Sequence, residues 1–416
     1  MTSKLNFIIK ILFLLIPVAL VSGPFLPDLF LSLVSIIYLI FIIKTKNYKI
    51  FNNYFTYLFI AFYCVIIISS FLSEIKSISL VTSITYIRFF IFSFCIYHII
   101  NTDKKIIFFL AIILISLFIL LLIDSLVQFY YGQNLIGIKS SNDSWLRISS
   151  FFGKELKLGS FTIRFLPILL ACIPFLSLKR KNENILIVVI LAISFVLIYV
   201  SAERTSFFLF LLLMLSISFI LPKRYFLITI ILFSFLAFVV SKSNKSSFER
   251  LFIFTFDQLG FFNQKVDDDR KKLNIFSNQH QSHYQTAFKM FKDSPFFGQG
   301  PKSFRFLCDD SKFNSGNLSC STHPHNTYIQ ILSETGIFGS FYLFILLIYF
   351  LKKYYEIFKL HLAGKLIDRT EFFLVITFFV SLYPFVPSGN FFNNWLSIIY
   401  YYPVGLYLYK MKIHKL

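Results

Sequence analysis

The chain has 416 residues, of which 57% are hydrophobic and only 14% are charged, and its formal net charge is +20. Soluble domains are about 45–50% apolar, and the apolar residues here form solid runs of about 20 residues, the length that crosses a bilayer. These runs exclude an ordinary soluble protein, and because they do not alternate with polar residues they also exclude a membrane β-barrel. We therefore predict an all-α polytopic protein embedded in a lipid bilayer.

In chain order, the apolar runs predict about twelve transmembrane helices. No small-residue cleavage site follows the first run, so it is interpreted as a membrane span and not as a signal peptide. The spans are expected at 7–22, 25–43, 54–72, 78–100, 105–127, 161–178, 184–201, 204–221, 223–241, 326–351, 371–387 and 391–410.

Lysine and arginine gather in every second connection, for example at Lys179–Lys181, whereas the connections Ser22–Asp28 and Pro387–Asn390 contain neither. This alternation follows the positive-inside rule and predicts that both termini are cytoplasmic. It also explains the positive net charge, so we expect no nucleic-acid binding. The chain then divides into a bundle of about nine helices (1–241), a large periplasmic loop (242–325), and C-terminal helices with a cytoplasmic tail (326–416).

The large outer loop has two features of its own. It contains a predicted amphipathic helix with one apolar stripe, made of Tyr284, Ala287, Phe288 and Phe291. It also contains Cys308 and Cys320, which could pair in an oxidising periplasm or remain free thiols. Asp267–Asp269 is interpreted as a solvated turn, and a smaller outer loop at 128–160 contains Trp145 and Arg147.

The outer loop ends in His323-Pro324-His325-Asn326, and a hydrophobic helix follows at once. Imidazole is the side chain that exchanges protons near neutral pH, and here it lies where water meets membrane. Gly336 and Gly339 would let a neighbouring helix or a lipid-linked ligand approach the backbone closely. The alternative interpretation is a helix cap with an interfacial histidine.

Three segments together resemble the O-antigen ligase and polymerase superfamily: Ser294–Gly300, Phe304-Arg305, and His323 through Gly336. The resemblance is strongest over residues 200–340 and implies a multi-span glycosyltransferase of the bacterial inner membrane, with its active site facing the periplasm. The ligases of this superfamily transfer a glycan from undecaprenyl diphosphate to a sugar hydroxyl of lipid A-core. The resemblance therefore implies a lipid-linked donor, a glycan acceptor, no cofactor and no metal.

The resemblance also implies roles for individual residues. His325 would be the general base, supported by His323, Asn326, Glu334, Gly336 and Gly339. Arg204, in the outer turn Ser201–Ser206, would bind the diphosphate as a bidentate fork. Its alternative is an interfacial arginine paired with Glu203. The second phosphate-binding residue stays open among Arg250, Arg305 and His280. Glu334 would either orient His325 or cap the helix.

Other polar residues are weaker candidates. Arg88, which lies in mid-span, and Arg164, near an outer end, could each approach phosphate or be structural. The loop histidines also suggest zinc, but the pair His280 and His283 has no third ligand at a motif spacing, so we expect no metal site.

The acceptor distinguishes an O-antigen ligase, an O-antigen polymerase and a protein O-oligosaccharyltransferase, and no residue of the sequence identifies it. These three functions therefore remain open. A polysaccharide transporter is a further alternative. It would predict charges throughout the mid-bilayer and broken helices in both halves of the chain.

Overall fold

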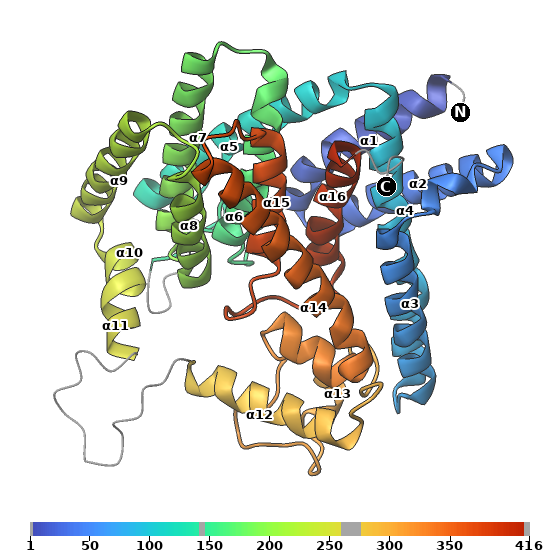
Figure 1. Cartoon of the computed structure of the whole chain (residues 1–416). Coiled ribbons are helices and arrows are strands. Elements are labelled where there is room, and N and C mark those ends of the chain that lie inside the picture. Colours follow the sequence, from blue (N-terminus) through green and yellow to red (C-terminus); the bar gives the residue numbers. More distant parts are fainter. Residues whose placement is uncertain (1–2, 141–145, 259–275, 412–416) are drawn as a thin grey trace, which may run out of the picture.

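The computed structural model describes residues 3–140, 146–258 and 276–411 (Figure 1). Within these ranges the chain is helical and forms no strand, only isolated bridges such as that between Gln133 and Lys139. The all-α prediction is thereby confirmed. Trp145 and Asp267–Asp269 lie outside the described residues.

Helices occupy all the positions at which membrane spans were expected. Nine segments of the described chain are long and apolar enough to cross a membrane, whereas α8, α15 and α16 are shorter. The bounds are α1 Ser3–Ser22, α2 Phe25–Thr45, α3 Tyr54–Leu72, α4 Lys76–Thr102, α5 Lys105–Tyr131, α6 Leu158–Cys172, α7 Arg180–Ser201, α8 Arg204–Ile217, α9 Lys223–Ser243, α14 Thr327–Leu362, α15 Arg369–Ser381 and α16 Asn394–Lys410. The chain is thus a polytopic membrane protein, while twelve spans and the outer side of 242–325 stay predictions.

Short segments join these helices. They are η1 Tyr48–Phe51, η2 Ser150–Phe152, η3 Ile173–Leu176, α10 Ser246–Phe248, the π-helical η4 Glu249–Ile253, α11 Phe254–Gln258, α12 Asn278–Asp293 and α13 Phe304–Leu307. In Figure 1, α12 and α13 lie together at one end of the bundle, beneath α14.

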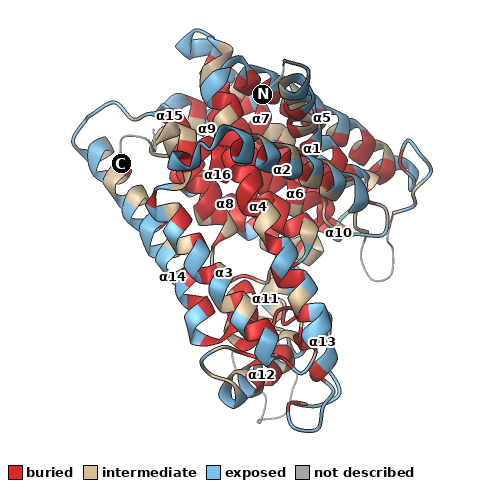
Figure 2. Ribbon diagram, turned by 90° about the vertical axis from the view of Figure 1, so that its right-hand side faces the viewer, coloured by how far each residue is buried: buried red, intermediate tan, exposed pale blue. Residues whose placement is uncertain are grey.

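The last helix of the chain lies at the centre of the fold. Every residue of α16 from Trp395 to Leu408 is buried, and Figure 2 shows α16 and α4 in the buried interior. A side chain at Gly405 would overlap Ile96 and the Ser93 carbonyl of α4, so the close approach of the two helices at this point requires glycine. Ser93 Oγ also donates to the Tyr401 carbonyl at 3.0 Å. Because α16 is surrounded by other helices and not by lipid, it can be shorter than a helix that faces the bilayer.

The predicted amphipathic helix exists as α12, but its buried face differs from the predicted stripe. The buried residues are His283, Thr286, Ala287 and Met290, whereas Phe288 is 49% exposed. The predicted stripe was chosen for its large aromatic side chains. In the structure, α12 packs against α14 and α13 through smaller side chains instead. Ala287 and Met290 form an apolar cluster with Phe304, Leu307, Cys308 and Phe313, and Cys308 is disulfide-bonded to Cys320.

Helix α14 is broken at Gly336, whose φ of 67° lies in the left-handed region. The loop Ser294–Gly300 enters the break: Gly300 N donates to the Glu334 carbonyl at 2.8 Å, and Ile337 N donates to the Pro295 carbonyl at 2.9 Å. A Cβ at position 336 would overlap the Phe296 carbonyl. The close approach expected for a helix or a lipid-linked ligand is made instead by this loop. A Cβ at Gly339 would meet only Thr335 of its own helix.

Candidate active site

Four histidines that are far apart in sequence form one cluster. The ring centroid of His325 lies 4.2 Å from that of His323, 5.3 Å from that of His280 and 5.2 Å from that of His283. His280 and His283 lie on adjacent turns of α12, and the other two precede α14. His325 therefore occupies the middle of the cluster.

His323 is held by hydrogen bonds at both ring nitrogens. Its Nε2 donates to the Ser388 carbonyl at 3.1 Å, and its Nδ1 lies 2.9 Å from the Thr322 hydroxyl. Because a carbonyl can only accept, Nε2 carries the proton and Nδ1 must accept from Thr322. This ring has no nitrogen left for a substrate.

His325 is held differently, by one ring nitrogen and its backbone. Its φ of 59° is left-handed, and its carbonyl accepts from Ser388 N at 2.9 Å. Ser321 Oγ lies 3.0 Å from Nε2, and no described residue hydrogen-bonds Nδ1. Nδ1 is therefore the ring nitrogen that remains for a substrate proton.

Both rings are neutral at physiological pH. Burial, followed by the neighbouring histidines, lowers the pKa of His325 to about 3. Burial lowers the pKa of His323 to about 4, although its hydrogen bond to Ser388 works in the opposite direction. The sequence-based expectation of a base with a pKa near the ordinary value of about 6.5 therefore does not hold, because the ring is buried. The neutral ring can accept a proton, but as a weak base.

Asn326 and Glu334 hold the backbone around the histidines. Asn326 caps α14, since its Oδ1 accepts from Tyr328 N and Ile329 N, and its Nδ2 donates to the Pro384 carbonyl at 2.8 Å. The buried Glu334 carboxylate accepts from Lys302 N, Phe304 N and Gln330 Nε2. Glu334 therefore neither contacts His325 nor caps α14, the two roles expected from the sequence. It fixes the loop that follows Gly300.

The connection between α15 and α16 was missed as part of the site. Ser388 contacts both His323 and His325, and its hydroxyl lies 2.7 Å from the Thr327 hydroxyl. Asn390 accepts from Gln330 at 2.9 Å and donates to the Thr322 carbonyl at 3.4 Å. The sequence signal was present: Pro387–Asn390 is a charge-free connection of turn-forming residues.

Arg204 is not paired with Glu203, so the pairing proposed in that alternative is wrong. Glu203 turns toward the start of α6, where it accepts from Gly159 N at 2.8 Å and Ser160 N at 3.0 Å. Arg204 instead donates to Gln258 Oε1 at 2.6 Å, and its guanidinium lies 5.1 Å from the Phe254 ring centroid. Its charge therefore has no carboxylate partner in the described chain.

Arg250 and Arg147 join Arg204, and these three residues form what we call the arginine group. Burial, then the charges of Arg147 and Arg204, lower the pKa of Arg250 to about 10. Its Nε donates to the Ala202 carbonyl at 3.0 Å. The backbone that follows Arg147 is fixed, since Gln128 Oε1 accepts hydrogen bonds from Ser149 N and Ser150 N. These bonds hold Arg147 near the other two arginines.

The arginine group adjoins the histidine cluster through His280. Burial lowers the pKa of His280, with further contributions from His283 and Arg204. Arg250 and His280, two of the residues left open by the sequence, thus lie on the Arg204 side of the cluster. Arg147 was noted in its loop but not recognised as a site residue, because only folding brings it there.

The third open candidate, Arg305, lies elsewhere. It is exposed on α13, and its charge acts on His323, whose pKa it helps to lower after burial. Arg88 forms an ion pair with Asp28 at 2.7 Å. Arg164 is buried in α6, where it donates to the Ser160 carbonyl of its own helix at 3.1 Å.

Among the described residues, no group of three or more histidine, cysteine or acidic side chains is arranged to hold a metal ion. Within the cluster, the rings of His283 and His325 are stacked at an interplanar angle of 25°, whereas the other ring pairs are tilted. Nitrogens on stacked rings do not converge on a shared point, which metal ligation requires.

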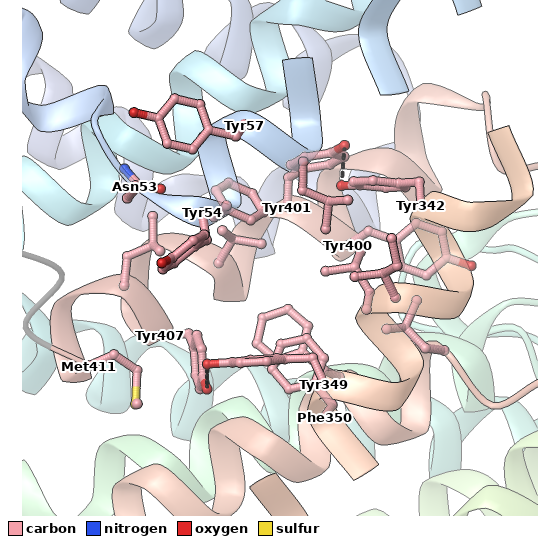
Figure 3. Close-up of a pocket in the computed structure, with 18 of the residues that line it drawn as sticks. Asn53, Tyr54, Tyr57, Tyr342, Tyr349, Phe350, Tyr400, Tyr401, Tyr407 and Met411 are labelled. Carbon is pink, nitrogen blue, oxygen red and sulfur yellow. Dashed lines mark hydrogen bonds between the residues drawn. The ribbon is translucent and has the colours of Figure 1, made fainter. Parts of the chain in front are cut away.

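A cavity of about 1150 Å³ lies inside the described bundle between α3, α14 and α16 (Figure 3). Its lining is mainly aromatic and apolar and includes Tyr54, Tyr57, Tyr342, Tyr349, Tyr400, Tyr401 and Tyr407. Its wall meets the site at Tyr400, whose hydroxyl lies 3.3 Å from the Thr327 hydroxyl. The polar site therefore adjoins an apolar interior.

Comparison with known proteins gives one positive result. Residues 186–353 match the family model described as O-antigen ligase. The matched range runs from α7 into α14 and contains Arg204, Arg250 and all four clustered histidines. The chain has no significant match among curated proteins.

Proposed function

We propose, from the match of residues 186–353 to the O-antigen ligase family model, that the chain transfers a glycan from undecaprenyl diphosphate to a sugar hydroxyl of lipid A-core. The reaction would take place at the periplasmic face of a bacterial inner membrane, with both termini in the cytoplasm. One observation carries the proposal: the neutral imidazole of His325, with one ring nitrogen free of described partners, lies in a cluster that adjoins the arginine group, where Arg204 has no carboxylate partner among the described residues.

The arginine group would bind the diphosphate of the donor. Guanidinium forks match phosphate oxygens, and charge-assisted hydrogen bonds of this kind are about twice as strong as neutral ones. Burial, followed by the charges of Arg147 and Arg204, lowers the pKa of Arg250, so an anion among the three residues relieves their repulsion. The same charges would then stabilise the diphosphate as it leaves.

His325 would accept the proton of the acceptor hydroxyl at Nδ1. As that proton moves, the acceptor oxygen bonds to the anomeric carbon and the bond from this carbon to the diphosphate oxygen breaks. The glycan is thereby transferred, and undecaprenyl diphosphate is released as an anion. A bound diphosphate places negative charge near the histidines, which raises the pKa of His325 toward neutrality and strengthens the base when the donor is present.

The test is transfer by the purified protein in lipid nanodiscs, with glycan-bearing undecaprenyl diphosphate and lipid A-core. His325→Ala should lose about 10²–10⁴-fold in rate, the usual contribution of a general base. His361→Ala is the matched control, because His361 lies in the last turn of the long helix α14, far from the cluster. Full activity of His325→Ala would contradict the assignment.

Gene deletion separates this function from its nearest alternative. Loss of all polymeric chains from core, with lipid-linked polymer accumulating, indicates a ligase. Core that carries a single repeat unit indicates a polymerase, which would use the same donor and a lipid-linked acceptor.

A further inference from the structure

A second group of positive charges lies at the other end of the histidine cluster. It consists of Lys302, Arg305 and Arg88, and we call it the lysine–arginine group. Burial lowers the pKa of Lys302, and the charges of Arg305 and Arg88 lower it further. The three cations are therefore close enough to repel one another.

The acidic residues nearby offset this group only in part: the charges of Glu334 and Asp28 raise the pKa of Lys302, but burial and the charge of Arg305 lower it more. Asp28 pairs with Arg88. The Glu334 carboxylate is taken up by two backbone amides and Gln330, as described above. The Lys302 ammonium and the Arg305 guanidinium have no hydrogen-bond or ion-pair partner in the part of the chain that the structure describes. Two such cations held together, one of them half-buried, leave an excess of positive charge.

The backbone that carries this group is rigidly held. Lys302 adopts a left-handed φ of 63°. Ser79 Oγ donates to the Pro301 carbonyl at 3.0 Å, and a Cβ on Gly300 would clash with Ser73 and Ser79. The turn is thus fixed to the connection between α3 and α4, and a strained conformation fixed in this way is a feature of ligand sites.

The two basic groups act on different histidines. The charge of Arg204 acts on His280, whereas the charge of Arg305 acts on His323, and His325 lies between these two rings. In Figure 1, α10 and α11 lie at the left and α13 at the right, and α12 runs between them. The candidate base therefore has positive charge on both sides.

We propose that Lys302 and Arg305, with the Arg88–Asp28 pair behind them, bind an anionic group of the acceptor, a phosphate or a carboxylate. Donor and acceptor would then approach His325 from opposite ends of the histidine cluster. This inference rests on the proposed function and deepens it, because it assigns Arg305 to the acceptor and not to the donor diphosphate.

The test is steady-state transfer kinetics in nanodiscs, with the donor and acceptor concentrations varied separately. Lys302→Gln/Arg305→Gln should raise the KM for lipid A-core by about 10-fold or more, as expected when hydrogen bonds to a charged group are lost. The KM for the donor should stay within about two-fold, because the proposal gives these two residues no hydrogen bond to the donor. Lys292→Gln, an exposed cation on α12, is the matched control and should leave both constants unchanged.

The source of the anion is identified with altered acceptors and altered lipid. Phosphatase-treated acceptor and acceptor with reduced carboxyl groups are compared with the native form. The treatment that removes the recognised group should raise the wild-type KM and abolish the effect of the double variant. If neither treatment does so, or if the variant's effect appears only in nanodiscs containing phosphatidylglycerol, the group binds a lipid headgroup and the proposal is wrong.

Two further outcomes are distinguishable from these. A rise in the donor KM for Lys302→Gln/Arg305→Gln would assign both basic groups to the diphosphate and overturn the inference. Absence of glycan transfer by the wild-type protein would instead refute the proposed function itself. Size-exclusion profiles that match the wild type establish that the variants are folded.

Discussion

His323 and His325 are one residue apart in sequence and have the same side chain, yet their surroundings give them different capacities. Ser388 and Thr322 use both nitrogens of His323, whereas Ser321 uses only one nitrogen of His325. An imidazole can serve as a base only through a free lone pair. His325 is therefore the candidate base, and His323 is a positioning residue that holds the 382–393 connection against the loop.

The lowered histidine pKa values predict a dependence of stability on pH. Folded values of about 4 for His323 and about 3 for His325 lie below the ordinary value of about 6.5. As the pH falls from about 6.5 toward these folded values, the histidines of the unfolded chain become protonated while those of the folded chain stay neutral. The free energy of unfolding therefore decreases. The stability should thus be highest above about pH 6.5 and decline toward pH 4.

This dependence can be measured by thermal unfolding in detergent at pH 7 and at pH 5. The wild-type midpoint should fall by several degrees, and His323→Gln should reduce that fall, because glutamine does not titrate. His361→Gln should behave as the wild type does. Equal pH dependence for His323→Gln and the wild type would show that His323 does not carry the effect.

At the scale of elements, two motif segments that looked like separate signals form one unit. The loop Ser294–Gly300 fills the break in α14 at Gly336, and the turn that follows presents Lys302 and Arg305. Gly298 packs against the Glu334–Gly336 backbone from the other side of the same contact. Glycines occur in both segments because two backbones meet without side chains between them.

Gly336→Ala should destabilise the protein far more than Gly364→Ala. Both glycines have a positive φ, of 67° and 68°, so both substitutions carry a conformational cost of about 1–3 kcal/mol. Only at Gly336 would the new methyl also overlap backbone, that of Phe296 and Phe297, whereas nothing lies within 4 Å at Gly364.

This difference in stability can be measured by unfolding the two variants in detergent with guanidinium chloride or with heat. We expect Gly336→Ala to lose transfer activity together with stability, since its loop carries the lysine–arginine group. Similar destabilisation of the two variants would mean that the loop does not occupy the break in α14.

At the scale of the whole molecule, α12 and α13, which carry His280, His283 and Arg305, lie at one end of the helical bundle (Figure 1). The charge alternation of the connections predicts that this end faces away from the cytoplasm. Chemistry on a lipid-linked sugar would then occur outside the membrane barrier, next to an apolar interior that contains the aromatic cavity.

Cysteine labelling tests this orientation. In a Cys64→Ala/Cys95→Ala/Cys172→Ala background, Lys154→Cys should react with a membrane-impermeant maleimide in cells whose outer membrane is permeabilised. Lys104→Cys should react only after the inner membrane is opened. Both positions are exposed, so accessibility within the protein does not bias the comparison. The reverse pattern would invert the predicted topology.

The sequence by itself determined the helical membrane class, the helix positions and the motif that ends in Asn326. These properties follow from hydropathy, charge and capping, which add up over neighbouring residues. It also indicated that Cys308 and Cys320 could pair, and the structure joins them.

Only the tertiary structure decided how distant polar residues are grouped. It brought the four histidines together, placed Arg147 and Arg250 with Arg204, and separated Arg305 from them. It also turned Glu203 away from Arg204, rotated the buried face of α12 and lowered the histidine pKa values. Each of these depends on burial and on contacts between segments far apart in the chain, which no local pattern contains.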